Sequence, residues 1–357
     1  MSGERWNSRI LEALSLEKGN LSTEDIFPRG ELLDLKIKEK ARPAVILVDG
    51  PINPLSIFIE PSMDSIKHTP ELDKHINTVW NEAENRFKQK FPDKEFTNGS
   101  KVLVKKIFSE YDQKLDLDKI IIETGVTDYK ERIATIKPEY QIAQKYGLES
   151  VAIQLATSSI ILTRDKKICL AQLGTKTDEK PRIGGIHTIA GLLEMQEDKT
   201  PLLPPENILR EISEELGFEP VETWDHFDPE SILGIVQDPK IFATDIIYLV
   251  VTDLTEKEIR ARRGKSDKEI GLVFIDDTEE AINDAILVYA KTGTASALSG
   301  LYLYGKACFG EYYGWAIPVR ERLLRRFAVW DRLDSYDLGV AEKIRSRTAN
   351  RLTRQHG

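Results

Sequence analysis

The chain has 357 residues, of which 41% are hydrophobic and 31% are charged, and its formal net charge is −9. This composition is typical of a globular protein long enough for two domains, or for one domain with a large extension. The acidic balance disfavours broad nucleic-acid binding, because that function requires basic surface to neutralise phosphates.

Cysteine usage and apolar runs indicate the compartment. Cys169 and Cys308 have no metal-ligand spacing, and two cysteines in a chain of this length predict no disulfide framework. The first thirty residues contain no apolar signal segment, and no apolar run is long enough to span a membrane. We therefore expect a cytoplasmic protein without a membrane partner.

The N-terminal part, residues 1–147, contains short separate elements. The spacing of its apolar residues predicts an amphipathic helix at Trp6–Leu16, and the run PAVILVD at 43–49 predicts a strand. Residues 50–70 contain several prolines and are expected to be irregular. Because 101–123 also contains strand-like runs, we expect an α/β extension that packs on the rest of the chain.

A helix and a hairpin are predicted inside this extension. Apolar residues recur at helical spacing from Leu72 to Phe87, and Pro92 is expected to end the helix. The runs at 101–111 and 119–129 are separated by polar residues, which predicts two strands of a β-hairpin.

From about residue 150 the predicted order is strands, one central helix, strands and a final helix, which is an α+β pattern. The predicted elements lie at 151–174, 204–217, 231–238, 245–254, 270–276 and 277–293. We expect one domain over 148–310, followed by a C-terminal helix and basic tail over 311–357.

The central helix places three carboxylates, Glu211, Glu214 and Glu215, close together on one side. Like charges at this spacing repel by roughly 0.2–0.5 kcal/mol per pair on an open helix. A hard cation such as Mg²⁺ accepts oxygen ligands of this kind, and Arg210 is placed to hold one carboxylate in orientation. The alternative is a solvated acidic helix face with no ligand.

The residues before and within this helix resemble the Nudix box, whose signature is G-x5-E, seven residues, and R-E-U-x-E-E-x-G-U, with U a bulky apolar residue. Gly191 and Glu197 match the first part, and 210–218, REISEELGF, matches the second without a mismatch. The departure is the spacer, which has twelve residues, 198–209, in place of seven. Insertions are tolerated in a loop of this kind.

The resemblance implies a Nudix hydrolase fold, with a mixed sheet between helices, and a Mg²⁺ or Mn²⁺ cofactor. It implies that the metal ligands are Glu211, Glu214, Glu215 and the carbonyl of Gly191, that Glu211 and Glu214 serve catalysis, and that Glu197, Arg210 and Gly217 support the box. In many family members, the residue that serves as general base lies in a loop after the box. Glu269, just before a predicted strand, is our candidate for that role, and ordinary surface charge is the alternative.

A looser resemblance, over roughly 70–285, is to the Nudix branch of UDP-sugar pyrophosphatases. It rests on Trp80 in a helix, on 125–130 and on 158–166, with Lys130 standing where that branch has arginine. It also departs at 189–194, which reads IAGLLE where the branch has P-G-G-H-x-E. From the residues, Trp80 is expected to pack in a core. The candidate substrate-binding residues are His187, Tyr129 and Lys130.

The expected function is metal-dependent hydrolysis of a nucleotide sugar to a nucleoside monophosphate and a sugar 1-phosphate. Other Nudix substrates remain open, namely ADP-ribose, dinucleotides and nucleoside triphosphates. An alternative of another class is a non-catalytic ligand sensor on the same scaffold. We expect a small-molecule nucleotide as partner and no nucleic acid. A homodimer is open, with Leu301–Tyr304 as a candidate interface segment.

Overall fold

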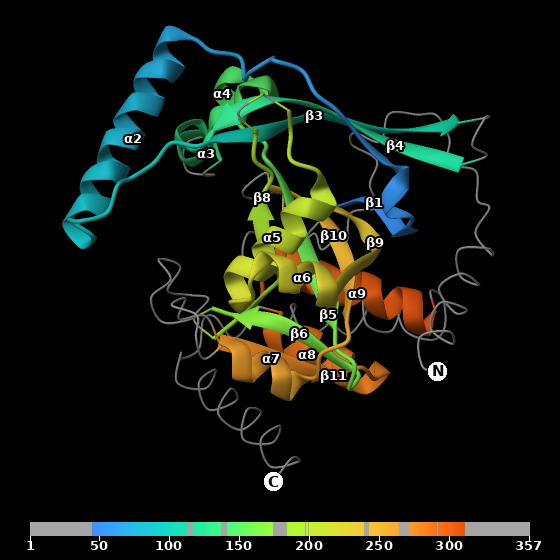
Figure 1. The fold of residues 1–357 in the computed structure, drawn as a ribbon. Helices are drawn as coiled ribbons and strands as arrows, with labels where there is room; N and C mark the ends of the chain where they lie inside the picture. Colours follow the sequence, from blue (N-terminus) through green and yellow to red (C-terminus); the bar gives the residue numbers. More distant parts are fainter. Residues whose placement is uncertain are drawn as a thin grey trace, which may run out of the picture.

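The computed structural model describes residues 45–112, 117–136, 141–173, 184–196, 198, 200–238, 243–263, 271–290 and 292–310. Within these ranges the chain combines a mixed β-sheet with helices, as the α+β expectation requires (Figure 1). The expectations for the helix at 6–16, for Glu197, for Glu269 and for 311–357 fall outside the described residues.

The main sheet contains eight strands in the described part of the chain, in the order β1-β9-β10-β5-β6-β11, with β7 beside β6 and β8 beside β5. The pair β10–β5 is parallel and the other pairs are antiparallel. The strands are β1 (Val45–Ile52), β5 (Leu155–Leu162), β6 (Lys167–Gln172), β7 (Ile186–His187), β8 (Ile189–Leu192), β9 (Phe227–Asp238), β10 (Ala243–Thr252) and β11 (Gly271–Asp276).

A second sheet, β2-β4-β3, is built by the N-terminal part. The predicted hairpin is confirmed as β3 (Ser100–Asp112) and β4 (Leu117–Asp128), which pair antiparallel. The segment expected to be irregular contains a short 3-10 helix (Pro54–Ser56) and β2 (Ile57–Glu60). The N–H of Val102 donates to the carbonyl of Leu193 at 3.1 Å, so β3 also contacts the loop after β8.

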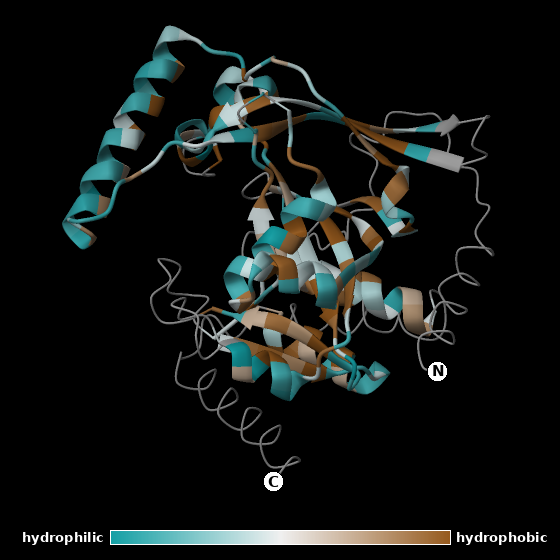
Figure 2. Cartoon of the chain, viewed as in Figure 1, coloured by the Kyte–Doolittle hydropathy of each residue, from teal (hydrophilic) through white to brown (hydrophobic). Residues whose placement is uncertain are grey.

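Three helices accompany this second sheet: α2 (Pro70–Lys90), α3 (Tyr129–Thr135) and α4 (Ile142–Tyr146). Helix α2 contains the predicted stretch from Leu72 to Phe87, and at its start Thr69 Oγ1 accepts from the N–H of Leu72. It lies at the side of the molecule, and most of its length is hydrophilic (Figure 2). Trp80, expected to pack, stacks on Phe96 with ring centroids 4.5 Å apart.

Helices cover both faces of the main sheet. On one face lie α5 (Pro204–Leu216), α6 (Pro220–His226) and α7 (Glu256–Arg263), and on the other lie α8 (Glu279–Tyr289) and α9 (Ala295–Phe309) (Figure 1). Because successive side chains of a strand point to opposite faces, β5 contributes to both cores. No helix within the described ranges has the length and apolar character needed to cross a bilayer.

The candidate interface at Leu301–Tyr304 is wrong. This segment lies in α9, where Leu301 and Tyr304 are fully buried against the sheet of the same chain. The hydroxyl of Tyr304 donates to Asp277 Oδ1 at 2.7 Å. The apolar side chains therefore form part of the internal core.

Candidate functional site

Helix α5 carries the three carboxylates, and its ends follow from its sequence. Pro204 and Pro205 occupy the first turn, where no amide donor is missed. Gly217 ends the helix in the left-handed region, with φ of 76°. The predicted apolar stripe is buried on the sheet and consists of Ile208, Leu209, Ile212 and Leu216.

The positive group between the carboxylates is Arg210. Its Nη2 donates to Glu211 Oε1 at 2.7 Å, and its Nη1 donates to Glu214 Oε1 at 3.0 Å. Glu211 is 8% exposed, whereas Glu214 is exposed and Glu215 is half-buried. The sequence predicted that Arg210 would hold one carboxylate, and in the structure it forms ion pairs with two.

Gly191 lies against the carboxylate of Glu211. A Cβ at position 191 would come within 2.0 Å of both the carboxyl carbon and Oε1 of Glu211. Strand β8 pairs with β5 so that Gly191 faces Thr157, which fixes this approach from the sheet. A larger residue here would displace the carboxylate, because its side chain would occupy the position of the carboxylate.

The long spacer before α5 folds back on itself. The N–H of Leu202 donates to the carbonyl of Glu194 at 2.9 Å, and the N–H of Gln196 donates to that of Thr200 at 2.8 Å. Met195 and Pro201 also form an isolated β-bridge. These contacts bring the end of the spacer back to residues 194–196, and α5 therefore starts beside the loop that follows Gly191.

Asn207, which the sequence pattern did not single out, joins the parts of the site. This fully buried amide donates from Nδ2 to Thr157 Oγ1 at 2.8 Å and to the carbonyl oxygen of Gly191 at 3.2 Å. Its Oδ1 accepts from Arg210 Nη2 at 3.0 Å. The available signal was a polar residue one turn before Glu211, on the same side of the helix as the three carboxylates.

Lys101 of β3 brings a further charge to the loop after β8, where it forms an ion pair with Glu194. Burial opposes ionisation of Glu194, but the hydrogen bond and charge of Lys101, together with the charge of Arg210, lower its pKa. Glu194 is therefore held as a carboxylate. The pair also ties the N-terminal sheet to the Gly191 loop.

The glutamate carboxylates and the Gly191 carbonyl are chemically suited to a hard cation, because carboxylates and backbone carbonyls are the oxygen ligands that Mg²⁺ accepts. The structure places Glu211 against Gly191 and links Glu211 to Glu214 through Arg210. However, no group of three or more His, Cys, Asp or Glu side chains within the described ranges is close enough together to hold a metal ion. A metal would therefore compete with Arg210 for these carboxylates.

Tyr129 and Lys130 lie at the start of α3. Lys130 Nζ donates to Asn77 Oδ1 of α2 at 2.6 Å, and its backbone N–H donates to Asn98 Oδ1 at 2.8 Å. The ring of Tyr129 meets that of Phe96 edge-on, at 6.2 Å between centroids. These described contacts join α3 to α2 and its following loop, and a role in substrate binding stays a prediction.

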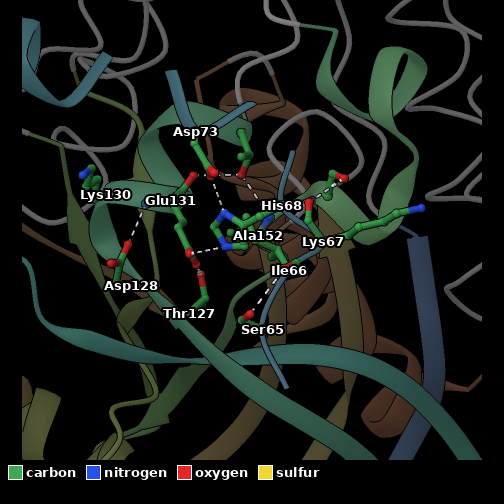
Figure 3. A network of polar contacts seen from close by, with 12 residues as sticks. Ser65, Ile66, Lys67, His68, Asp73, Thr127, Asp128, Lys130, Glu131 and Ala152 are labelled. Carbon is green, nitrogen blue, oxygen red and sulfur yellow. Dashed lines mark hydrogen bonds and ion pairs between the residues drawn. The ribbon is translucent and has the colours of Figure 1, made fainter. Parts of the chain in front are cut away.

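Beside Lys130, a polar network joins α2 and α3 (Figure 3). His68 lies between two carboxylates, with Nδ1 2.6 Å from Asp73 Oδ1 and Nε2 3.1 Å from Glu131 Oε1. The hydroxyl of Thr127 donates to Glu131 Oε2 at 2.6 Å. Partial burial lowers the pKa of His68, but its hydrogen bonds and the charges of Asp73 and Glu131 outweigh that effect, and the net pKa is raised.

Replacing His68 with glutamine is expected to destabilise the protein more at pH 6 than at pH 8.5. A histidine whose pKa is raised on folding stabilises the fold fully below its unfolded pKa, and this contribution is lost as pH rises through the folded pKa. Urea unfolding of both proteins at the two pH values measures the difference. Equal destabilisation at both values would contradict the ion-pair account.

His187 is half-buried at the end of β7, and its Nδ1 contacts the carbonyl of Thr188. Desolvation lowers the pKa of His187, which favours the neutral imidazole, and the contact with Thr188 only partly offsets this effect. The Thr188 hydroxyl donates to Ser158 Oγ at 3.1 Å and contacts Ser296 Oγ at 3.2 Å. His187 thus borders a group of hydroxyls beneath α9, and contact with a ligand stays a prediction.

The carboxyl of Asp245, which the sequence pattern did not single out, joins this cluster of hydroxyl side chains. Ser158 Oγ donates to Asp245 Oδ1 at 2.7 Å. Burial, assisted by the charge of Asp238, raises the pKa of Asp245 to about 6, against the opposing effects of Ser158 and of the charge of Arg132. At neutral pH the fold therefore holds a charged carboxylate in an unfavourable position.

Asp245→Asn is expected to be more stable than the wild type at pH 7.5, by on the order of 2–3 kcal/mol, with a smaller advantage at pH 5. A carboxyl whose pKa is raised on folding stabilises the fold below the unfolded value of 3.8, and this contribution is lost as pH rises through about 6. Chemical denaturation across this range measures the difference. The exposed Asp284→Asn serves as control, and a pH-independent effect of Asp245→Asn would refute the argument.

Comparison with known proteins gives no assignment, because no family model matches the chain and no curated protein matches it. The contacts among Gly191, Asn207, Arg210, Glu211 and Glu214 are therefore the basis for a functional proposal.

Proposed function

We propose that the chain is a metal-dependent pyrophosphohydrolase of the Nudix type. Its substrate would be a nucleoside diphosphate derivative, specifically a nucleotide sugar, cleaved to a nucleoside monophosphate and a sugar 1-phosphate. The observation that carries the proposal is the placement of Glu211 against Gly191, with Arg210 between Glu211 and Glu214. This placement joins the two separate parts of the box motif in one local site.

Mg²⁺ or Mn²⁺, when bound, would neutralise the pyrophosphate and lower the pKa of the attacking water. Glu211, Glu214 and Glu215, with the carbonyl of Gly191, would supply the oxygen ligands. Water attacks phosphorus, the bridging P–O bond breaks, and a carboxylate accepts the proton of the water. Glu211 is the candidate within the described residues for that base, and Glu269 is the candidate outside them.

Arg210 would hold the carboxylates in orientation before substrate arrives. Its guanidinium donates to both Glu211 and Glu214, which offsets the repulsion between two like charges on one helix face. Arg210 also offers an interaction for the negative charge that develops on phosphate oxygens, once either carboxylate turns to a metal. The family's other substrates, ADP-ribose, dinucleotides and triphosphates, are compatible with the same arrangement.

A second candidate function is a non-catalytic ligand sensor. The observation that favours it is that Arg210 already pairs with two of the three carboxylates, while the described residues contain no preformed metal cluster. A binding protein would keep these ion pairs permanently. It would bind a nucleotide without turnover and without a metal requirement.

The test is a panel of UDP-glucose, GDP-mannose, ADP-ribose, a dinucleotide and nucleoside triphosphates. Each is incubated with the full chain in Mg²⁺ or in EDTA, and the products are separated by anion-exchange chromatography. Mg²⁺-dependent cleavage of a nucleotide sugar is the expected result. Cleavage of another member would retain the pyrophosphohydrolase and discard the sugar assignment. Binding without cleavage in either condition would favour the sensor.

A further inference from the structure

We infer that Asn207 is the positioning residue of this site. Its amide sets the direction of the Gly191 carbonyl and of the Arg210 guanidinium, and through Arg210 it sets both Glu211 and Glu214. The inference rests on the proposed function, because positioning has a kinetic meaning only if the site turns over substrate. Asn207 lies outside the conserved letters of the box motif, in its variable spacer.

The orientation of the Asn207 amide follows from its partners. A backbone carbonyl can only accept and a guanidinium can only donate, so the nitrogen faces Gly191 and the oxygen faces Arg210. The second amide hydrogen is used by Thr157 Oγ1 at 2.8 Å. A flipped amide would place oxygen against oxygen at Gly191 and nitrogen against nitrogen at Arg210. The fully buried side chain therefore has one satisfied orientation.

Thr157 anchors this amide to the rigid part of the fold. It lies in β5, which pairs with β10 on one side and with β8 on the other. Asn207 is thus held by a central strand, and Arg210 and Glu211 follow it by three and four residues on the same helix. One chain of contacts leads from β5 through Asn207 to Arg210 and from there to both carboxylates.

Two substitutions separate the functions of the amide. Asn207→Asp retains an acceptor for Arg210 but loses the donors to Gly191 and Thr157, whereas Asn207→Ala loses all three contacts. Thr157→Val removes the strand anchor alone, with little change in shape, and addresses the same question if the Asn207 variants fail to fold. Asn283→Asp is the matched control, since Asn283 is a buried asparagine of α8 on the other face of the sheet.

The measurements are kcat, KM and binding of Mn²⁺ followed by electron paramagnetic resonance, on the full chain of each folded variant. Loss of a contact that orients ligands typically costs about 10–100-fold in metal affinity or activity. We expect Asn207→Ala to weaken Mn²⁺ binding and lower kcat to this extent, with a smaller change in KM. Thr157→Val should change the same two quantities in the same direction, and Asn283→Asp should change neither.

A different pattern would overturn the inference. If folded Asn207→Ala or Thr157→Val matches the wild type in both Mn²⁺ affinity and kcat, the amide only satisfies buried groups and positions nothing. If the wild type itself neither binds Mn²⁺ nor cleaves any nucleotide, the proposed function fails, and the inference fails with it. The behaviour of the wild type therefore distinguishes the two failures.

Discussion

Glu214→Gln is expected to lower turnover of the nucleotide substrate by at least about 100-fold, the upper end of what loss of an orienting outer contact costs. Under the proposed function, the change removes one anionic oxygen ligand of the metal and leaves Arg210 paired with Glu211. The fold should persist, because the Glu214 side chain is 46% exposed and an exposed ion pair contributes only about 0–1 kcal/mol.

Turnover at a series of Mg²⁺ concentrations, with thermal unfolding in parallel, checks this expectation. Glu206→Gln is the control, because Glu206 lies in the first turn of the same helix and makes the same chemical change. Near-normal turnover of Glu214→Gln with an unchanged metal requirement would defeat the assignment of Glu214 as a metal ligand.

Gly191→Ala is expected to reduce turnover about 100-fold, because a displacement of about 1 Å at a reacting group can cost that much. The new Cβ would stand 2.0 Å from the carboxyl carbon of Glu211. That carboxyl is the far end of a flexible side chain, so the carboxylate moves and the backbone is retained. Activity should therefore fall much more than stability.

Gly99→Ala provides the matched control, since the nearest atom to its added Cβ is the Nζ of Lys101 at 3.9 Å. Circular dichroism and thermal unfolding establish that both variants fold, and turnover is then compared. If Gly191→Ala retains wild-type turnover, the close approach of Glu211 to residue 191 serves packing and not chemistry.

The sequence predicted the helices and strands that follow from the local spacing of apolar and polar residues. The stripe from Ile208 to Leu216 predicts α5 because apolar residues recur at the helical period, and the polar break between 101–111 and 119–129 predicts the hairpin. The contacts that complete the site join distant residues. Asn207 and Thr157 are 50 positions apart, and Lys101 and Glu194 are 93 apart, so no local pattern reveals them.

The mistaken interface in α9 has a physical reason. Apart from Lys306 in its last turn, the segment 295–309 is apolar or small, so its sequence does not distinguish a helix buried within the chain from one that meets a second copy. The partner is the sheet. Gly300 allows close packing there, since a Cβ at that position would lie 2.8 Å from Cδ1 of Ile160.

The pairing of β1 with β9 has a consequence for how the chain is made. Val45 pairs with Gln237, 192 positions later, and the intervening residues include the second sheet and α5. At a synthesis rate of about 5–20 residues per second, roughly 10–40 s separate the appearance of the two strands. Contacts this distant in sequence also slow the folding search. β1, whose partner in the described sheet is β9, must therefore wait for that strand, and the sheet is complete only after β11, which ends at Asp276.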